Sequence, residues 1–512
     1  MPELNWVGKD AVKNHDKEVP FKLLRKVREI SVGEKSENLI IHGDNLEALK
    51  ALMPFYKGRI KCIYIDPPYN TGNEGWIYND KNNSPKIKKW LGKVVGGESE
   101  DLNRHDKWLC MMYPRLNLLK KLMANDGVMF VHIDEFEFAS LKCLGDELFG
   151  SENFDALVWK KTANITNTKI INRIKTSHEY ILIFYKDRKS VSFSKVKNRT
   201  NWNKEYSNPD GDKRGGYLPG IISLHEDRSR KNSANFYSVK LPSGRIITRE
   251  WYMPKDEYER LVADNRIYFP KAGDGTPRVK IFQNDEQFQY CNSIIEDFGT
   301  FSDAKRELED LLGENVFDTP KPRKLVSEMI RMSTKKDDLI LDSFAGSGTT
   351  GHAVLDLNKE DDGNRRFIMV EMEDNVAKDI TAKRINRAIA KYEYRDGFEY
   401  CELDKPLFDE NGQIDKSCTF EQLATYIYFT ETHTNIDKKA LRNNFIGELG
   451  ETEYYLLFRE KGKNILDEKF LKELKQNEKK KIIYADSCLI DAETLEKYHI
   501  VFKQIPYEIE RY

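Results

Sequence analysis

Two short segments of the sequence carry residues that could do chemistry. The first, Asp66-Pro67-Pro68-Tyr69, directly follows a run of apolar residues. Its two prolines fix the backbone and remove two N–H donors, so the turn presents a carboxylate and carbonyl oxygens beside an aromatic ring. Asp66 and the Pro67 carbonyl could accept the two hydrogens of an exocyclic amine on a planar heterocycle, while Tyr69 stacks on the ring. The segment therefore predicts a site that holds an amine and directs its lone pair.

The second segment is Gly346-x-Gly348-x-x-Gly351, which follows a strand pattern and opens a helix pattern. Glycines in such a turn let the backbone approach a ligand, and Glu371, twenty residues further on, could bind ribose hydroxyls. Thr349 lies at the helix N-terminus, where free N–H groups can hold a carboxylate. The pattern predicts a nucleotide-type ligand without naming it, since dinucleotides and S-adenosylmethionine both carry a ribose. Ordinary tight turns remain the structural alternative for both segments.

Apolar periodicity around the two segments predicts an α/β fold. Buried strands followed by amphipathic helices are expected at 39–42, 60–65, 127–133, 339–341 and 367–370. Strands at 154–160 and 180–185 follow one another with no helical pattern between them. Both chemical segments begin where a predicted strand ends, which is where open α/β sheets bind their ligands.

The α/β pattern is interrupted by a basic insertion. Residues 191–280 hold 18 Lys and Arg against 11 Asp and Glu, with many aromatic residues and no sustained period. We therefore expect five parts: an N-terminal arm, the two halves of one α/β domain separated by the insertion, and a C-terminal domain, at 1–37, 38–190, 191–315, 316–400 and 401–512.

Composition excludes several classes of protein. The chain has 83 Lys and Arg against 84 Asp and Glu, so a nucleic-acid site must be a local concentration of positive charge. No apolar run reaches the ~18–20 residues of a membrane span, and the N-terminus does not resemble a signal peptide, so we expect a soluble, cytoplasmic protein. Seven widely spaced cysteines and the absence of His-Glu-x-x-His predict neither a disulfide framework nor a metal site.

The two segments together resemble the DNA adenine-N6 methyltransferases. DPPYN (66–70) is similar to the catalytic motif of that family, and FAGSG (344–348) is similar to its cofactor motif. Their order, with a basic insertion between them, resembles the β class. Further stretches resemble the modification subunits of type III restriction–modification systems: GDNLEAL, IKCIYIDPPYNTGN, WLCMMYPRLNLLKKLM, GVMFVHIDE and SHEYILIFYK. The resemblance covers roughly residues 38–190 and 318–400.

The resemblance implies a Rossmann-like, seven-stranded methyltransferase sheet that is circularly permuted and carries one antiparallel strand. The strands before Asp342 and Glu371 would be its first and second. Those at 39–42, 60–65 and 127–133 would be its third, fourth and fifth, and the strands within 154–185 would form the hairpin with the reversed strand.

The resemblance also implies S-adenosyl-L-methionine as the cofactor and assigns residues to it. Phe344, Gly346 and Gly348 would surround its methionine part, Glu371 would bind its ribose, and Asp44 would lie near its adenine. Asp66 to Tyr69 would hold a target adenine flipped out of duplex DNA, since the DPPY form favours adenine over cytosine. Transfer would be a direct displacement that uses no metal.

The insertion takes the place of the family's target-recognition domain. Its arginines and lysines, interleaved with aromatic residues, suit phosphate contacts and base readout, although solvated surface charge is the alternative for each one. The candidate DNA-binding residues are Arg199, Arg228, Arg230, Lys231, Arg245 and Arg249.

The type III resemblance implies partners besides double-stranded DNA: a second copy of the chain in a homodimer, and a separate helicase–nuclease restriction subunit. The sequence contains no G-x-x-x-x-G-K-[ST] phosphate loop, so an ATPase of that kind would have to be a different chain. Three alternatives stay open: a solitary DNA adenine methylase, a non-catalytic DNA-binding protein, and an NAD-dependent oxidoreductase that would use the glycine turn and leave DPPYN unexplained.

Overall fold

The computed structural model describes residues 3–33, 36–70, 104–162, 176–197 and 205–509, with short gaps at 283–284, 286–287, 297, 314–315, 410, 438–440, 459–463 and 475–476. The chain forms two compact units. Unit 1 comprises residues 1–194 and 292–512, and unit 2 comprises residues 195–291.

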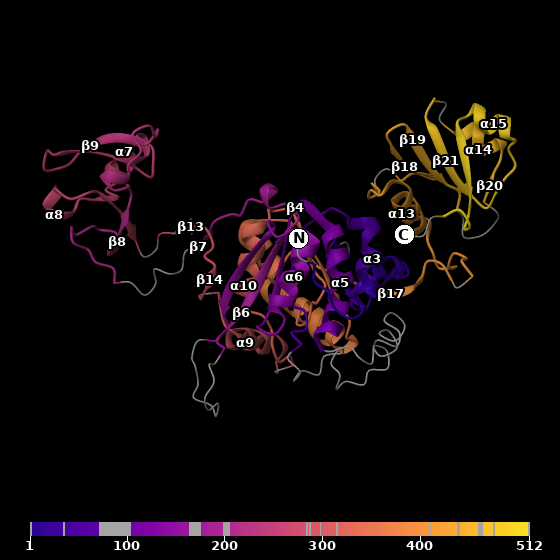
Figure 1. The fold of residues 1–512 in the computed structure, drawn as a ribbon, viewed down its shortest axis with the longest axis horizontal. Coiled ribbons are helices and arrows are strands. Elements are labelled where there is room, and N and C mark those ends of the chain that lie inside the picture. The colour runs from indigo at the N-terminus through magenta and orange to yellow at the C-terminus, as the bar shows by residue number, and fades with distance from the viewer. Residues whose placement is uncertain are drawn as a thin grey trace. The chain divides into compact units, whose positions relative to one another are not determined.

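Unit 1 is built on a sheet whose described strands number ten (Figure 1). The seven predicted strands lie next to one another in this order: β2 (Leu39–His42), β16 (Arg366–Glu371), β15 (Leu339–Asp342), β3 (Ile60–Ile65), β4 (Met123–Ile133), β6 (His178–Tyr185) and β5 (Phe154–Lys160). The first five are parallel, and β6 is antiparallel to both of its neighbours. The predicted methyltransferase sheet is therefore confirmed, with the reversed strand where no helical pattern separates two strands.

The sheet is wider than the seven strands expected. β17 (Glu399–Pro406) pairs with β2, and β1 (Lys22–Lys26) pairs with β17, which extends one edge. β14 (Ile294–Ile295) pairs with β5 and extends the other. The predicted N-terminal arm thus supplies a strand, and it also forms α1 (Lys9–Val12) and α2 (His15–Glu18), which contact α5 (Arg104–Leu122). Short polar segments of this kind have no periodicity that predicts pairing.

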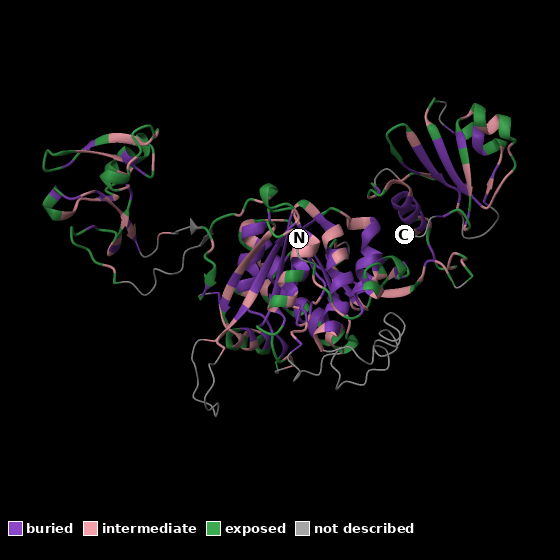
Figure 2. Ribbon diagram, viewed as in Figure 1, coloured by how far each residue is buried: buried purple, intermediate pink, exposed green. Residues whose placement is uncertain are grey.

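Helices cover both faces of the central strands, and the strands are buried along their length (Figure 2). All six residues of β3 are buried, as expected for a strand of a parallel sheet covered on both faces. The helices of this layer are α3 (Asn45–Tyr56), α5, α6 (Phe138–Phe149), α9 (Phe301–Leu312), α10 (Arg323–Ser333), α11 (Thr349–Asp361) and α12 (Lys383–Tyr392), with the π-helical segment η5 (Val376–Ala382) before α12 and a 3-10 turn, η2 (Arg188–Ser190), after β6. In the described part of the chain every helix is too short or too polar to span a lipid bilayer.

Unit 2 has a small core of its own around the buried Trp251 and Tyr258. Its elements are β7 (Val196–Lys197) paired with β13 (Phe288–Gln289), the sheet β11 (Ile267–Tyr268), β12 (Arg278–Phe282) and β8 (Tyr217–Ile221), the hairpin β9 (Phe236–Lys240) and β10 (Ile246–Glu250), and the helices η4 (Glu226–Arg228), α7 (Lys255–Ala263) and α8 (Pro270–Gly273). The unit is shorter than the expected insertion, 191–315, because β14 and α9 pack within unit 1 against β5 and α12.

The C-terminal part of the chain is α/β, as predicted. It contains α13 (Phe420–Thr432) and a four-stranded sheet in the order β18 (Phe445–Leu449), β19 (Thr452–Leu456), β21 (Lys480–Ala485) and β23 (Ile500–Gln504). The last three strands are parallel, and the smaller elements are β20 (Ile465–Leu466), α14 (Glu468–Glu473), β22 (Ser487–Cys488) and α15 (Ala492–Lys497). The expected boundary at 401 falls inside β17, a strand of the central sheet.

Candidate active site

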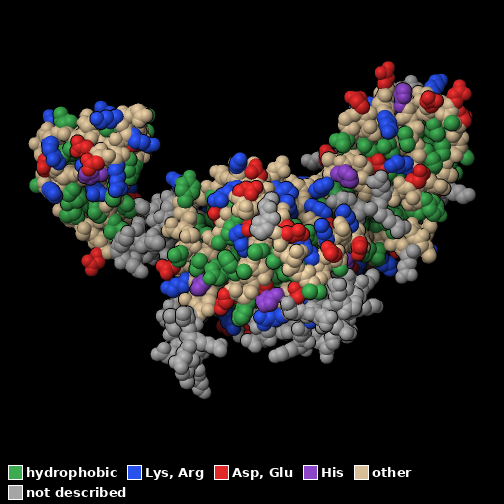
Figure 3. Space-filling view, in the orientation of Figure 1, with side chains coloured by type: hydrophobic (Ala, Val, Ile, Leu, Met, Phe, Trp, Pro, Cys, Tyr) green, Lys and Arg blue, Asp and Glu red, His purple; other side chains and the backbone are tan. Residues whose placement is uncertain are grey.

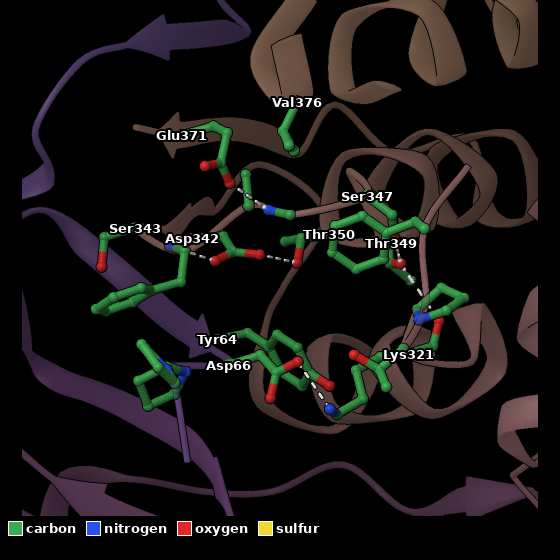
Figure 4. Close-up of a pocket in the computed structure, with 18 of the residues that line it drawn as sticks. Tyr64, Asp66, Lys321, Asp342, Ser343, Ser347, Thr349, Thr350, Glu371 and Val376 are labelled. Atoms are coloured by element: carbon green, nitrogen blue, oxygen red, sulfur yellow. Dashed lines mark hydrogen bonds and ion pairs between the residues drawn. The ribbon is translucent and has the colours of Figure 1, made fainter. Parts of the chain in front are cut away.

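A cavity of about 1050 Å³ lies at the carboxyl ends of β15, β16 and β3 (Figure 4). It is large enough for a nucleotide-sized ligand. Both segments singled out from the sequence line it, because the strands that precede them are neighbours in the sheet. Residues of its lining include Asn45, Tyr64, Asp66, Pro67, Pro68, Tyr69, Phe344, Gly346, Ser347, Thr349 and Glu371.

Both carboxylate oxygens of Asp66, the first residue of the DPPY turn, have a partner in the site. The Tyr69 hydroxyl donates to Oδ1 over 2.7 Å, and the Lys321 ammonium lies 2.7 Å from Oδ2. Trp108 donates its indole N–H to the Pro68 carbonyl over 2.7 Å, which occupies that acceptor from behind the turn. Burial raises the pKa of Tyr69 well above its usual value, so the phenol stays neutral and remains a donor.

A cluster of buried charges lies behind Asp66. Glu179 on β6 is 3% exposed, lies 3.6 Å from the Lys321 ammonium and 3.4 Å from that of Lys161, and accepts from Tyr69 over 3.0 Å. Burial alone would raise the pKa of Glu179, but Lys321 and its other neighbours lower it to about 2. Burial alone would lower the pKa of Lys321, but the nearby carboxylates of Asp66 and Glu179 outweigh that effect and raise the pKa above its usual value. The site therefore holds an ionised network of opposite charges.

These residues escaped the sequence reasoning, although each had a signal. Lys321 stands between two prolines directly before a helix, and Glu179 is an acid in an otherwise apolar strand, HEYILIFY. His132, on β4, is fully buried, with the Tyr64 hydroxyl 2.7 Å from its Nε2.

The glycine turn begins at Asp342, the last residue of β15. Its carboxylate accepts the Phe344 N–H over 3.0 Å and the Thr350 hydroxyl over 2.5 Å, and burial raises its pKa to about 7. Gly346 and Gly348 have φ of 49° and 77°, the left-handed region that glycine adopts most readily. A Cβ at Gly346 would lie 3.1 Å from the Phe317 ring. The turn is therefore built for glycine.

Glu371 closes this turn from the neighbouring strand. One carboxylate oxygen accepts the Gly346 N–H over 2.8 Å, and the other accepts the N–H groups of Met372 and Glu373 over 2.8 and 3.1 Å. Burial raises the pKa of Glu371. The side chain thus shapes the turn and also faces the cavity (Figure 4).

Other side chains brace the turn from outside the cavity. Arg384 of α12 is fully buried and donates to the Thr349 hydroxyl over 2.8 Å and to the Ser347 carbonyl over 3.3 Å.

Asp44 caps α3 by accepting the N–H groups of Leu46 and Glu47, and the Arg115 guanidinium lies 3.2 Å from its other oxygen. The carboxylate of Asp44 therefore starts a helix, and the next residue, Asn45, lines the cavity.

The described candidates for DNA contact all lie in unit 2. Four of them are exposed, Arg228, Arg230, Lys231 and Arg245, and Arg199 lies outside the described residues. Arg230 is paired with the buried Glu250, while Arg249 donates to the Leu224 carbonyl. Arg245 Nε lies 3.2 Å from Asp274. On the face seen in Figure 3, Lys and Arg side chains are spread among acidic and apolar ones over this unit.

Comparison with known proteins places the chain among methylases. A sequence model of a family described as DNA methylase, the N6/N4 methyltransferases, matches residues 60–383. The Mod subunit of the type III restriction-modification enzyme StyLTI from Salmonella typhimurium is 32% identical over 398 residues, covering 75% of this chain and 60% of that protein. The EcoPI Mod subunit of Escherichia phage P1 is 30% identical, covering 85% and 72%, and that of EcoP15I from Escherichia coli is 30% identical, covering 76% and 69%.

The chain thus spans between 60 and 72% of the length of these three relatives. The resemblance to type III modification subunits is confirmed, and the family model confirms the predicted membership of the DNA methylases. Fold, cavity and sequence agree that this chain belongs to the N6/N4 DNA methylase family.

Proposed function

We propose that this protein transfers the methyl group of S-adenosyl-L-methionine to the N6 amine of an adenine flipped out of duplex DNA. The observation that carries the proposal is the meeting of two motifs in one cavity. The DPPY turn, which suits an exocyclic amine, lines the same space as the glycine turn, which suits a nucleotide-type cofactor.

The cavity has features that fit S-adenosyl-L-methionine. Six carboxylates line it against two lysines, Lys161 and Lys321, and this negative excess favours a ligand that carries a sulfonium and an ammonium group. The six are Asp66, Asp134, Glu179, Asp342, Glu371 and Glu373. Phe344, Gly346, Gly348 and Thr349 would hold the methionine part, Glu371 would hold the ribose, and the turn at 44–45 would hold the adenine. When bound, the cofactor supplies an electrophilic methyl group.

The DPPY turn would hold the target base. Asp66 and the Pro67 carbonyl would accept the two N6 hydrogens, because the Pro68 carbonyl is already occupied by Trp108. The Tyr69 ring would stack on the base while its hydroxyl stays tied to the two carboxylates. This arrangement would turn the nitrogen lone pair out of the ring plane, and positioning of that kind is worth up to ~7–11 kcal/mol when alignment is ideal.

Unit 2 would read the DNA sequence. The exposed Arg228 and Lys231 suit phosphate contacts, which orient a protein on the duplex. Arg230 and Arg249 bind groups of unit 2 itself, so we assign them to the stability of that unit. Arg245 is close to Asp274 and is also exposed, so it could serve stability or DNA contact.

We further infer that the chain acts as the modification subunit of a type III system. Its Mod relatives support this reading and a separate restriction subunit as partner. We also propose that the chain forms a homodimer. We place the protein in the cytoplasm, where its proposed DNA substrate lies. The protein alone should methylate a plasmid and leave it uncut, whether or not ATP and magnesium are present.

The test is to incubate the native protein with S-adenosyl-L-methionine and plasmid, digest the DNA and identify methylated nucleosides by mass spectrometry. N6-methyladenine is expected. N4-methylcytosine, or no methylated base, would contradict the proposal. Asp66→Ala should transfer less than a tenth as fast as the native protein while binding cofactor and DNA within a few-fold, because its carboxylate matters mainly to the aligned amine.

A further inference from the structure

Lys321 occupies a position that cofactor binding and base stacking do not explain. Its side chain is only 6% exposed, and its ammonium lies between the carboxylates of Asp66 and Glu179, 2.7 and 3.6 Å away (Figure 4). The same ammonium lies over the rings of Tyr69 and Phe301, 5.0 and 5.2 Å from their centroids. Burying an ammonium is costly unless it is paired, so this placement calls for a reason.

The backbone of Lys321 is tied to the other half of the site. Its carbonyl accepts the Thr349 hydroxyl over 3.3 Å, and prolines on both sides, Pro320 and Pro322, restrict the chain. One residue therefore joins the glycine turn, through its carbonyl, to the DPPY turn, through its ammonium. Lys321 thus contacts both turns, which follow neighbouring strands of the sheet.

Glu179 fixes the ammonium from the opposite side. It is buried on a central strand, accepts from Tyr69 over 3.0 Å and also lies near Lys161. Two carboxylates thus face two ammonium groups in a space largely closed to water, where such interactions are strong. Among the described residues, Asp66 and Glu179 are the two carboxylates that pair with the Lys321 ammonium. Removing Glu179 would leave Asp66 as the remaining partner.

This network restricts the Asp66 carboxylate. Tyr69 donates to Oδ1 and Lys321 to Oδ2, so the group cannot rotate without breaking one of these contacts. Each oxygen keeps a second lone pair for an incoming amine.

We propose that Lys321, held by Glu179, is a positioning residue for methyl transfer. Its ammonium holds the Asp66 carboxylate oriented toward the amine, while its carbonyl contacts the cofactor turn. This inference rests on the proposed function and adds two residues to the reaction.

The test compares Lys321→Met and Glu179→Gln with the native protein in single-turnover methyl transfer, at saturating S-adenosyl-L-methionine and DNA. We expect the rate to fall about 100-fold in Lys321→Met and about 10-fold in Glu179→Gln, since small misplacements of reacting groups cost this much. Affinity for S-adenosylhomocysteine by calorimetry, and KM for DNA, should stay within about threefold, because neither side chain is assigned to hold cofactor or base.

Lys50→Met is the matched control. Lys50 is also a buried lysine of unit 1, 2% exposed, with its ammonium donating to the Asp16 carbonyl over 2.8 Å, and it does not line the cavity. Its rate should stay within twofold of native even if its melting temperature falls as far as that of Lys321→Met.

Three results would overturn the inference: a near-native rate in Lys321→Met, an equal loss in Lys50→Met, or a parallel loss of cofactor affinity. If Lys321→Met does not fold, Glu179→Gln decides, and a rate within twofold of native would refute the network. A native protein that methylates no DNA at all would instead refute the proposed function.

Discussion

At the scale of the residue, Asp342 is a cavity-lining carboxyl group whose pKa the fold shifts toward neutrality. It is buried at the end of β15, and burial raises its pKa to about 7, so it gains its charge near neutrality. Below that value the side chain is neutral, and above it the carboxylate attracts cations. A ligand with a permanent sulfonium charge should therefore bind more tightly as the pH rises through 7.

We expect the affinity for S-adenosyl-L-methionine, measured by titration calorimetry, to rise several-fold between pH 6 and pH 7.5. Asp342→Asn should remove part of that rise, because the amide has no charge to gain in this range. The remainder is expected from Asp134, which also lines the cavity and whose pKa burial raises to about 7. The comparison of the two proteins cancels the titration of the ligand itself. Equal pH dependence in both proteins would show that Asp342 does not face the cation.

At the scale of the element, the strand β15, its glycine turn and α11 act as one unit. Gly346→Ala should weaken S-adenosyl-L-methionine binding at least tenfold by calorimetry. The alanine would have a left-handed backbone, which costs roughly 1–2 kcal/mol, and its Cβ would press on the Phe317 ring that lines the cavity.

Gly58→Ala is the control that separates the cost of a left-handed backbone from a steric clash in the cavity. Gly58 has φ of 68°, and in the described part of the chain no neighbouring side chain or backbone atom lies within 4 Å of the position that a Cβ would take there. The substitution therefore carries the same backbone cost away from the cavity. It should lower the melting temperature and leave cofactor affinity unchanged. Similar affinity in the native protein and Gly346→Ala would contradict the role of the turn.

At the scale of the whole molecule, we expect unit 2 to act as an exchangeable target-recognition domain. Its first and last strands, β7 and β13, pair with each other, so its two chain connections lie side by side. Replacing residues 195–291 with the equivalent unit of a relative of different specificity should therefore preserve the fold of unit 1 and move the methylated sequence.

Long-read methylation mapping of the host DNA would check this exchange. The control is a chimera exchanged over 191–315, which also removes β14 and α9 from unit 1 and should be less stable. Methylation at the original site by the 195–291 chimera would place sequence recognition elsewhere in the chain.

The predicted elements agree with the structure where periodicity is strong and differ where pairing is remote. The strands expected at 39–42 and 60–65 are β2 and β3, and the strand expected at 127–133 is the end of β4. β1 and β14 were not expected, since a strand of two to five residues acquires its stability from its neighbour in the sheet. The candidate arginines of unit 2 could not be sorted into exposed and paired ones from sequence alone.

The sequence by itself determined the two chemical motifs and the α/β class, because these depend on local residue types and on a resemblance carried by contiguous stretches. Only the tertiary structure decided that the Lys321 ammonium stands between Asp66 and Glu179, and that Glu371 closes the glycine turn. Those contacts join residues far apart in the chain, and they form because burial leaves each charge to find a partner within a few ångströms. No local pattern encodes such a choice.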